Sequence, residues 1–432
     1  GEAVALLGAD GKPVCDSIFY TDIRGNDCLE NLTSRVDPAS LEYRTGMPIN
    51  GMYTLPKLMW LQRNRPEILD RVHKMLPYGS YIAYALCGEY AVDSSLASRT
   101  LLFNRHTLDW DEETLSAFGV RRDWLPAFVP AGRPVGRMLD SVARELGIAG
   151  NPVIVSGVHD QVAAALGAGA IGPGNAVDGI GSAECITAVL PRDIDAKSMF
   201  RNNFCIEPHA VPGQALTLMF TNTAGAALKW YRDTFEQELR ARCDARQLNT
   251  YAELNKQLSD QPSPLLFLPH LAGTGTPYMD SQAAGMLCGL TLSTAKPDIY
   301  RAILEGMNFE MRYNMELLGG SGMRFDSLTA VGGGASPDVL QIKADILNKR
   351  IRTTNSTQGG TVGLAMLCGL ATSQFDSFEQ GVEKLVKITA DFAPGSRYRA
   401  LYDEKYGQYV KLYRANCEIY GRKARETSVW QS

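Results

Sequence analysis

The sequence has 432 residues, which is long enough for two domains with complete hydrophobic cores. Its formal net charge of −4, from 43 basic and 47 acidic residues, gives no electrostatic case for a nucleic acid or an anionic membrane as partner. No apolar run approaches the roughly 20 residues that span a bilayer, and the nine cysteines include no CxxC pair that would indicate a zinc site. These properties predict an enzyme of the cytoplasm.

The beginning of the chain predicts a hairpin. The segment ADGK lies between two apolar runs, and Gly11 can take the positive φ that such a turn needs. The second strand is expected to end near Asp22, so Asp22 and Arg24 would lie just past a strand end, where α/β sheets often contact ligands. The alternative is a turn aspartate beside a solvated arginine.

Residues 26–150 are mostly helical. A helix is predicted at residues 52–64, with Pro56 in its first turn. Within it, Lys57 could bind an anion or be a structural or solvated charge, and Trp60 is expected in the core. Four further helices are predicted: one that begins at Pro66, one at residues 81–90, one within residues 109–124 and one at residues 138–146.

One carboxylate stands at a strand-to-helix junction. The run PVIVSG predicts a short buried strand, His159 and Asp160 end it, and an Ala-rich helix follows. Asp160 could cap that helix or act as a catalytic base. The next turn, 178–183, favours the second use because its small residues let backbone N–H groups approach an anion, with the Ser182 hydroxyl beside them. On its own such a turn is only a hairpin signal.

A domain boundary is predicted near the glycines at 172–174, between an N-terminal domain of residues 1–172 and a C-terminal domain of residues 173–432. The second domain is expected to begin with strands and to continue with a helix at 224–239. Near the start of that helix, Gly225 would permit either a ligand or another helix to come close.

The remaining elements are two helical regions around a third glycine turn. A long helix is predicted at 297–318, and we expect its polar side, with Glu305, Asn308 and Arg312, to be solvated. The strand-like run SLTAV leads through VGGGASPD into another helix, an order typical of phosphate or nucleotide sites. The strand-like run LLFLPHLAG likewise leads into a Gly-Thr loop at 273–277. Three glycine turns after strands, at 178–183, 273–277 and 331–338, with one candidate base, predict a nucleotide held between two domains. The final segments, at 360–370, 378–388 and 398–420, are expected to be helices that cover the sheet.

These segments resemble the FGGY family of carbohydrate kinases, relatives of glycerol kinase and xylulokinase within the actin and hexokinase superfold. The first family signature is present in residues 52–64, at Thr54, Lys57, Trp60, Leu61 and Asn64. The second is present at Gly285, Leu287, Gly289, Leu290, Asp298, Ile299, Ala302, Ile303, Leu304 and Glu305. The segments GVHDQ, GIGSAE, AGAALKW, FLPHLAGTGTP and AVGGGASPDVLQIKADIL follow in family order. The resemblance implies a two-domain α/β fold of the actin/hexokinase-like (ribonuclease H-like) type, with the active site in the interdomain cleft.

The resemblance also implies roles for individual residues. Asp160 corresponds to the general base that takes the proton from the sugar hydroxyl as it attacks the γ-phosphate of ATP. Substrate contacts are implied at Asp22, Met52, His159 and Gln161. Nucleotide contacts are implied at Gly181, Ser182, Gly225, Gly333, Gly334 and Asp338, although relatives often have Asn at the last position.

One departure concerns the cofactor Mg²⁺. Family members begin with a strand and an Asp-Gly-Thr turn that holds Mg²⁺ and the ATP phosphates, followed by a segment that grips the sugar, and neither is found in this sequence. Three interpretations are open: a preceding segment holds both, a separate chain supplies them, or the protein is truncated. We favour the first, and we expect no metal ligand among these residues.

The leading hypothesis is an ATP-dependent kinase of a ketose (a pentulose or hexulose) or a polyol, with a homodimer left open. The rival is a catalytically inactive regulatory protein of the same fold that binds a sugar or a nucleotide. Another ATPase of the superfold is disfavoured, since both signatures are those of sugar kinases. An upstream Asp-Gly-Thr turn would favour the kinase over its rival.

Overall fold

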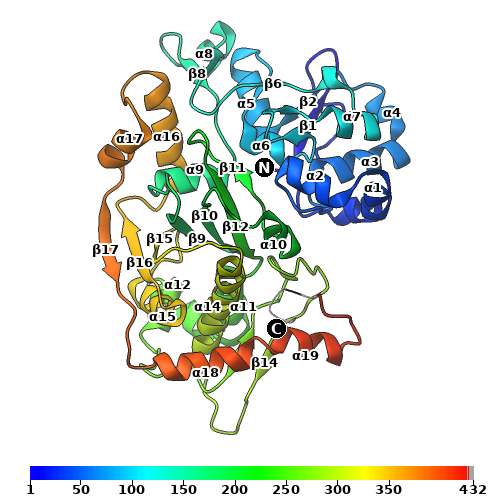
Figure 1. Ribbon diagram of the computed structural model, residues 1–432. Coiled ribbons are helices and arrows are strands. Elements are labelled where there is room, and N and C mark those ends of the chain that lie inside the picture. Colours follow the sequence, from blue (N-terminus) through cyan, green and yellow to red (C-terminus); the bar gives the residue numbers. More distant parts are fainter. Residues whose placement is uncertain (426, 428–432) are drawn as a thin grey trace. The chain divides into compact units, whose positions relative to one another are not determined.

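A computed structural model of the protein describes residues 1–425 and 427 (Figure 1). The chain forms two compact units. The first contains Gly1–Gly172, Cys205–Thr217 and Gly359–Leu385, and the second contains Pro173–Phe204, Leu218–Gln358 and the chain from Val386 onward. The chain therefore leaves the first unit after Gly172 and returns to it twice. Within the described part, every helix is too short or too polar to cross a bilayer.

The first unit is built from short strands and many helices. Its strands are β1 (Val4–Leu7), β2 (Lys74–Pro77), β3 (Ala91–Val92), β4 (Phe103–Asn104), β5 (Asp109–Trp110), β6 (Ala127–Phe128), β7 (Pro134–Arg137), β8 (Val153–Val155) and β11 (Glu207–Pro208). Its helices are η1 (Ile23–Cys28), α1 (Leu29–Arg35), α2 (Pro38–Thr45), α3 (Thr54–Asn64), α4 (Pro66–Leu69), α5 (Tyr78–Cys87), α6 (Ser94–Ser98), α7 (Glu112–Phe118), η2 (Arg122–Trp124), α8 (Asp140–Leu146), α9 (Asp160–Gly167), α16 (Gly359–Ala371) and α17 (Phe378–Leu385).

The predicted hairpin at the start of the chain is only partly correct. Gly11 has the expected positive φ of 73°. However, the run that ends at Asp22 is not a strand: after the turn a single bridge joins Leu7 to Pro13, and β1 pairs instead with β2. The bridge is flanked by two backbone hydrogen bonds, from the Gly8 N–H to the Lys12 carbonyl and from the Val14 N–H to the Leu6 carbonyl, both at 2.9 Å. Asp22 is therefore not at a strand end but at the N-cap of η1.

Helices α9 and α16 cross with their backbones in contact. A Cβ atom on Gly167 would lie 1.8 Å from the carbonyl oxygen of Gly359, and one on Gly363 would lie 2.0 Å from that of Ala163. The sequence predicted that the segments at 360–370 and 378–388 cover the sheet, but α16 and α17 pack on α9. The glycines explain the difference, because they let α16 approach α9 more closely than any side chain would permit.

Substituting alanine for Gly363 should therefore destabilise the first unit by about 1–3 kcal/mol, since the new methyl group overlaps the α9 backbone. Urea denaturation followed by circular dichroism measures this change. The control is Gly360→Ala in the same helix, where a Cβ meets nothing within 4 Å and stability should be unchanged or higher by up to about 1 kcal/mol. Equal stability of the two variants would contradict the close crossing.

The second unit contains longer strands and the longest helix. Its strands are β9 (Ala176–Ile180), β10 (Glu184–Val189), β12 (Ala215–Thr221, which begins in the first unit), β13 (Leu266–Leu268), β14 (Met286–Cys288), β15 (Ser327–Val331), β16 (Arg350–Thr354) and β17 (Ile388–Phe392). Its helices are α10 (Ala196–Arg201), α11 (Gly225–Phe235), α12 (Gln237–Ala245), α13 (Thr250–Asn255), α14 (Lys296–Gly320), α15 (Pro337–Leu347), α18 (Arg399–Tyr409) and α19 (Leu412–Ile419).

A seven-stranded mixed sheet organises this unit, in the order β11-β12-β10-β9-β15-β16-β17. Strands β9 and β10 form an antiparallel hairpin, whereas β15 is parallel to both β9 and β16. Helix α15 connects β15 to β16, as parallel neighbours require. The sequence analysis did not identify β16 or β17 as strands, and it assigned the start of β17 to a helix.

The prediction that the polar side of the long helix α14 is solvated is wrong. Glu305 and Asn308 are each only 1% exposed. The Glu305 carboxylate accepts hydrogen bonds from Lys405 Nζ at 2.5 Å and Arg301 Nε at 2.8 Å, so two cations neutralise it inside the unit. Helix α14 packs on β13, α15, α11 and α18, so its polar side faces protein, and Glu305 is satisfied by Lys405 of α18 and by Arg301 of α14 itself.

Candidate active site

Asp160 is the first residue of α9, five residues beyond Val155 at the end of β8. His159 occupies the N-cap position without a side-chain capping bond, so the capping role considered for Asp160 is not observed. The Asp160 side chain is 77% exposed. A hydrogen bond from His159, helped by the charge of that ring, holds the pKa of the Asp160 carboxyl well below its usual range. The result is an ionised carboxylate open to a substrate.

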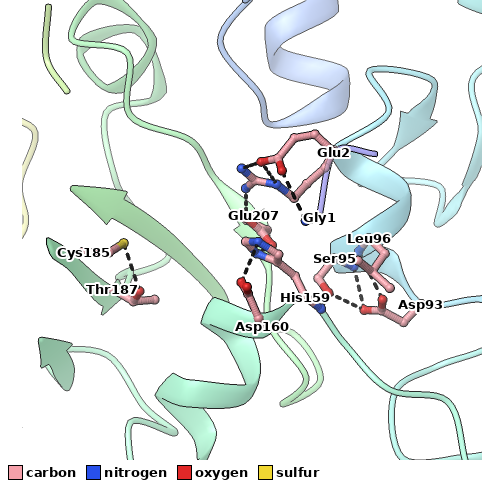
Figure 2. Close-up of polar contacts among 11 residues, drawn as sticks. Gly1, Glu2, Asp93, Ser95, Leu96, His159, Asp160, Cys185, Thr187 and Glu207 are labelled. Carbon is pink, nitrogen blue, oxygen red and sulfur yellow. Dashed lines mark hydrogen bonds and ion pairs between the residues drawn. The ribbon is translucent and has the colours of Figure 1, made fainter. Parts of the chain in front are cut away.

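His159 is buried, with only 4% of its surface exposed, and both ring nitrogens face carboxylates (Figure 2). Nε2 lies 3.0 Å from Asp160 Oδ1, and Nδ1 lies 2.9 Å from Glu207 Oε1. Burial and the charge of Arg99 lower the pKa of His159, but the charge of Glu207 and the hydrogen bonds to Asp160 and Glu207 together outweigh them, so the pKa is raised overall. When the ring carries both protons, each ring nitrogen can donate to its carboxylate partner.

Glu207 is in turn held by a buried arginine. Arg99 Nη1 donates to Glu207 Oε2 at 2.7 Å, and Arg99 also binds the carboxylate of Glu2. Sequence reasoning missed Glu2, Arg99 and Glu207, although Glu207 stands out as a charge within the apolar run NFCIEP. A buried charge in a protein is paired with another group. A single charged residue within an apolar run was therefore the feature of the sequence that indicated a buried, paired charge.

Of the other predicted sugar contacts, Gln161 is the second residue of α9, and Asp22 and Met52 lie in two packed segments of the first unit. Asp22 accepts hydrogen bonds from the Arg24 guanidinium at 2.8 and 2.9 Å, which lowers the pKa of its carboxyl. Met52 lies just before α3, and a Cβ atom on Gly25 of η1 would be 2.2 Å from the Gly51 carbonyl oxygen, so η1 and this segment are in close contact. Among the described residues, no hydrogen bond or ion pair joins Asp22 or Met52 to Asp160.

Lys57 has a structural contact. It is 4% exposed, and its Nζ donates to the carbonyl oxygen of Phe19 at 2.6 Å. Burial lowers the pKa of Lys57 to about 8. The lysine thus ties the loop before η1 onto α3.

In the second unit two of the predicted glycine turns, 178–183 and 331–338, meet at Ile180, and Gly225 at the start of α11 lies against Gly181, whereas the glycine loop at 273–277 packs on Phe220. The turn with Gly181 and Ser182 joins β9 to β10, and the Gly225 N–H donates to the Gly181 carbonyl at 2.9 Å. The Gly334 N–H donates to the Ile180 carbonyl at 3.2 Å. Ser182 and Gly333 are exposed, and Asp338 is an exposed residue in the first turn of α15. Exposed glycine backbone beside a helix N-terminus is suited to bind an anion such as phosphate.

A buried triad of charges lies below these turns. Lys343 of α15 binds Asp178 of β9 and, at 2.6 Å, Glu184 of β10; none of the three is more than 1% exposed. Burial raises the pKa of Glu184 to about 7 despite the neighbouring lysine. The triad fixes the Gly181–Ser182 turn relative to α15. Sequence reasoning missed it because Lys343 resembles an ordinary surface lysine of a helix.

The close approach at Gly225 supports a second testable prediction. A Cβ there would lie 2.6 Å from the Gly181 carbonyl oxygen, so Gly225→Ala should cost about 1–3 kcal/mol of unfolding free energy in urea. Gly319→Ala, in the last turn of α14, is the matched control because its Cβ meets nothing within 4 Å. If the two variants unfold at the same urea concentration, the two turns are not in contact as described.

Known proteins resemble this chain over nearly its whole length. A model of the FGGY family of carbohydrate kinases, N-terminal domain, matches residues 1–167, and the C-terminal domain model matches residues 180–372. A xylulose kinase of Lactococcus lactis is 29% identical over 425 residues, covering 96% of this chain and 81% of that protein. A gluconokinase of Bacillus licheniformis is 29% identical over 423 residues, covering 96% and 80%. The structure of ligand-bound xylulose kinase from Lactobacillus acidophilus matches with a TM-score of 0.85 at 24% identity, covering 97% of this chain and 83% of that chain. The predicted two-domain, actin-like α/β fold is thus confirmed.

Proposed function

Because the chain belongs to the FGGY family of carbohydrate kinases, which phosphorylate sugars with ATP, we propose that it transfers the γ-phosphate to a hydroxyl of a ketose or polyol, with Asp160 as general base. The observation that carries the proposal is the exposed Asp160 carboxylate, kept ionised by the hydrogen bond from His159. In this assignment residues 1–172 bind the sugar and residues 173–432 bind the nucleotide.

The proposed reaction requires little covalent chemistry from the protein itself. In phosphoryl transfer the catalyst mainly positions the reactants and stabilises charge. Asp160 accepts a hydrogen bond from the attacking sugar hydroxyl, aligns that oxygen with the γ-phosphate, and takes the proton as the new O–P bond forms and the bond to ADP breaks. A carboxylate with a low pKa suits this task because the proton leaves late, when the hydroxyl has become acidic.

For the nucleotide we propose contacts at the glycine turns of the second unit. Backbone N–H groups at Gly181, Ser182 and Gly333–Gly334 would bind phosphate oxygens, and the Ser182 hydroxyl would donate a further hydrogen bond. Gly225 and Asp338 complete the set. Within residues 1–425 and 427, no three His, Cys, Asp or Glu side chains are placed to hold a metal ion. We propose that Mg²⁺ is bound through the ATP phosphates, as is usual for this ion.

We propose that Asp22, Met52 and Gln161 contact the sugar. Gln161 is next to Asp160 in the sequence, and Asp22 and Met52 lie in packed segments of the same unit. The sequence also predicted a sugar contact at His159, whose two nitrogens already have carboxylate partners. A ketose such as xylulose is the first candidate. A sugar acid such as gluconate is the second, because a gluconokinase is as similar to this chain as a xylulose kinase, both being 29% identical. A cytoplasmic location and a homodimer stay predictions from the sequence.

The test is a coupled ADP-release assay on the product of the complete gene, with ATP and a panel of ketoses, polyols, glycerol and gluconate. We expect one ketose or polyol to give turnover that requires Mg²⁺. Turnover with gluconate alone would replace the substrate class and leave the base assignment standing. Binding of a sugar or ATP without turnover on any member would favour the regulatory alternative.

A further inference from the structure

The His159 side chain is clamped from several elements of the first unit. Its ring lies between Asp160 of α9 and Glu207 of β11, at 3.0 and 2.9 Å (Figure 2). Its backbone N–H donates to Ser95 Oγ at 2.9 Å, and Ser95 is held in turn by the buried Asp93 carboxylate. The imidazole therefore has no freedom to turn toward another partner.

The hydrogen-bond chemistry of this arrangement determines the protonation of the ring. An ionised carboxylate only accepts hydrogen bonds, and a neutral imidazole has a single N–H. Glu207 is kept ionised by Arg99, and Asp160 is exposed to water. Both contacts are satisfied together only when both ring nitrogens carry a proton, which is the imidazolium form.

The charges around the ring are consistent with that form. Those that face it or its direct partners are Asp160, Glu207, Arg99 and Glu2, with Asp93 behind Ser95. Counting Asp160, Glu207 and Glu2 as anions and Arg99 and His159 as cations leaves one net negative charge. A neutral His159 would leave two negative charges in a largely buried cluster, which is unfavourable.

Resting on the proposed role of Asp160 as base, we propose that His159 is a positioning residue whose imidazolium holds the Asp160 carboxylate in its reactive orientation, and that Glu207 keeps His159 protonated. The geometry thereby gives the kinase a pH window in which it is active. His159 contacts the base and not the sugar.

The acid side of this window follows from the sign of the His159 charge. A cation beside Asp160 disfavours protonation of the carboxylate, so Asp160 stays ionised to a lower pH than a free aspartate. Removing the ring raises the pH below which activity is lost.

The alkaline side follows from the unequal burial of the two carboxylates. The pKa of His159 is raised, so the imidazolium is present below that pKa and is lost as the pH rises through it. The proton that remains belongs on Nδ1, because Glu207 is fully buried and has no water to replace the bond, whereas Asp160 is 77% exposed. Nε2 then carries no proton and has a lone pair facing the Asp160 carboxylate. The hydrogen bond that holds Asp160 in its reactive orientation is lost.

The experiment measures kcat and KM against pH for the complete protein and the variants His159→Gln, Glu207→Gln, Asp160→Asn and His73→Gln. His73 is an exposed histidine of the same unit and serves as the control. We expect His159→Gln to lower kcat by roughly 10- to 100-fold with little change in the KM for ATP, and to move the acid limb to higher pH. Glu207→Gln should move the alkaline limb to lower pH, and His73→Gln should leave the profile unchanged.

The outcomes separate this inference from the proposed function. If Asp160→Asn abolishes turnover while His159→Gln and Glu207→Gln keep the wild-type pH profile, the positioning role is wrong and the base assignment stands. If Asp160→Asn keeps full activity, the proposed function itself fails. If the variants at the buried residues His159 and Glu207 do not fold, the imidazole ¹⁵N chemical shifts of the unmodified protein test the inference. A doubly protonated His159 at neutral pH is expected, and a neutral ring would overturn the inference.

Discussion

Replacing Asp160 with asparagine should reduce kcat by about 10²- to 10⁴-fold, the usual contribution of one positioned acid–base group. The amide keeps the size of the carboxylate but cannot take the proton of the sugar hydroxyl. Because the Asp160 side chain is 77% exposed and does not cap α9, the fold should be retained. Measurement of kcat and KM at saturating ATP, with the unfolding midpoint recorded in parallel, checks both parts.

The matched control is Asp140→Asn. Asp140 is also an exposed aspartate in the first turn of a first-unit helix, α8, so it shares the local setting of Asp160 without the contact to His159. Its substitution should leave kcat unchanged. An Asp160→Asn protein with kcat within a few-fold of the wild type would mean that another group receives the proton.

Replacing Lys343 with methionine should destabilise the second unit by about 3–5 kcal/mol, the cost of leaving a buried charge without its partner. Here two carboxylates, Asp178 and Glu184, would lose their shared cation in a site that is at most 1% exposed. Asp178 Oδ1 already lacks a hydrogen-bond partner among the described residues, so nothing in the site can compensate. Urea denaturation followed by circular dichroism gives the change in unfolding free energy.

Two further variants define the cause of that loss. Lys256→Met removes a lysine of the same unit whose side chain is 69% exposed, and it should change stability by less than about 0.5 kcal/mol. Adding Asp178→Asn and Glu184→Gln to Lys343→Met should recover part of the stability, because neutral amides need no counter-charge. Wild-type stability of Lys343→Met would show that the triad is not buried as described.

Local patterns in the sequence were sufficient for the elements that carry the candidate site. The hairpin of β9 and β10, the start of α9 at Asp160, and the order β15, glycines, α15 were all predicted correctly. Each depends on neighbouring residues: apolar runs form strands, an Ala-rich run forms a helix, and glycines mark the turns between them. The family signatures then identified the two-domain fold.

The partners of the buried charges could not be predicted from local sequence patterns. Glu305 was predicted to be solvated, the role of Lys57 was left open and Lys343 was not singled out, yet each is buried against groups that lie 38 to 165 residues away in the chain. The same holds for Glu207, which is 48 residues from His159 and 108 from Arg99. A charged side chain has the same local pattern whether water or a distant counter-charge satisfies it, so only the folded chain distinguishes the two.

The amino-acid order was thus enough to mark Asp160 as the candidate base and the glycine turns as the candidate phosphate site, because a strand end, a helix start and a tight turn are local properties. The protonation of His159 and the support of the phosphate turn by Lys343 depend on side chains that folding brings together. Their pKa values follow from burial and from the charges placed beside them, and neither is defined until the tertiary structure has formed.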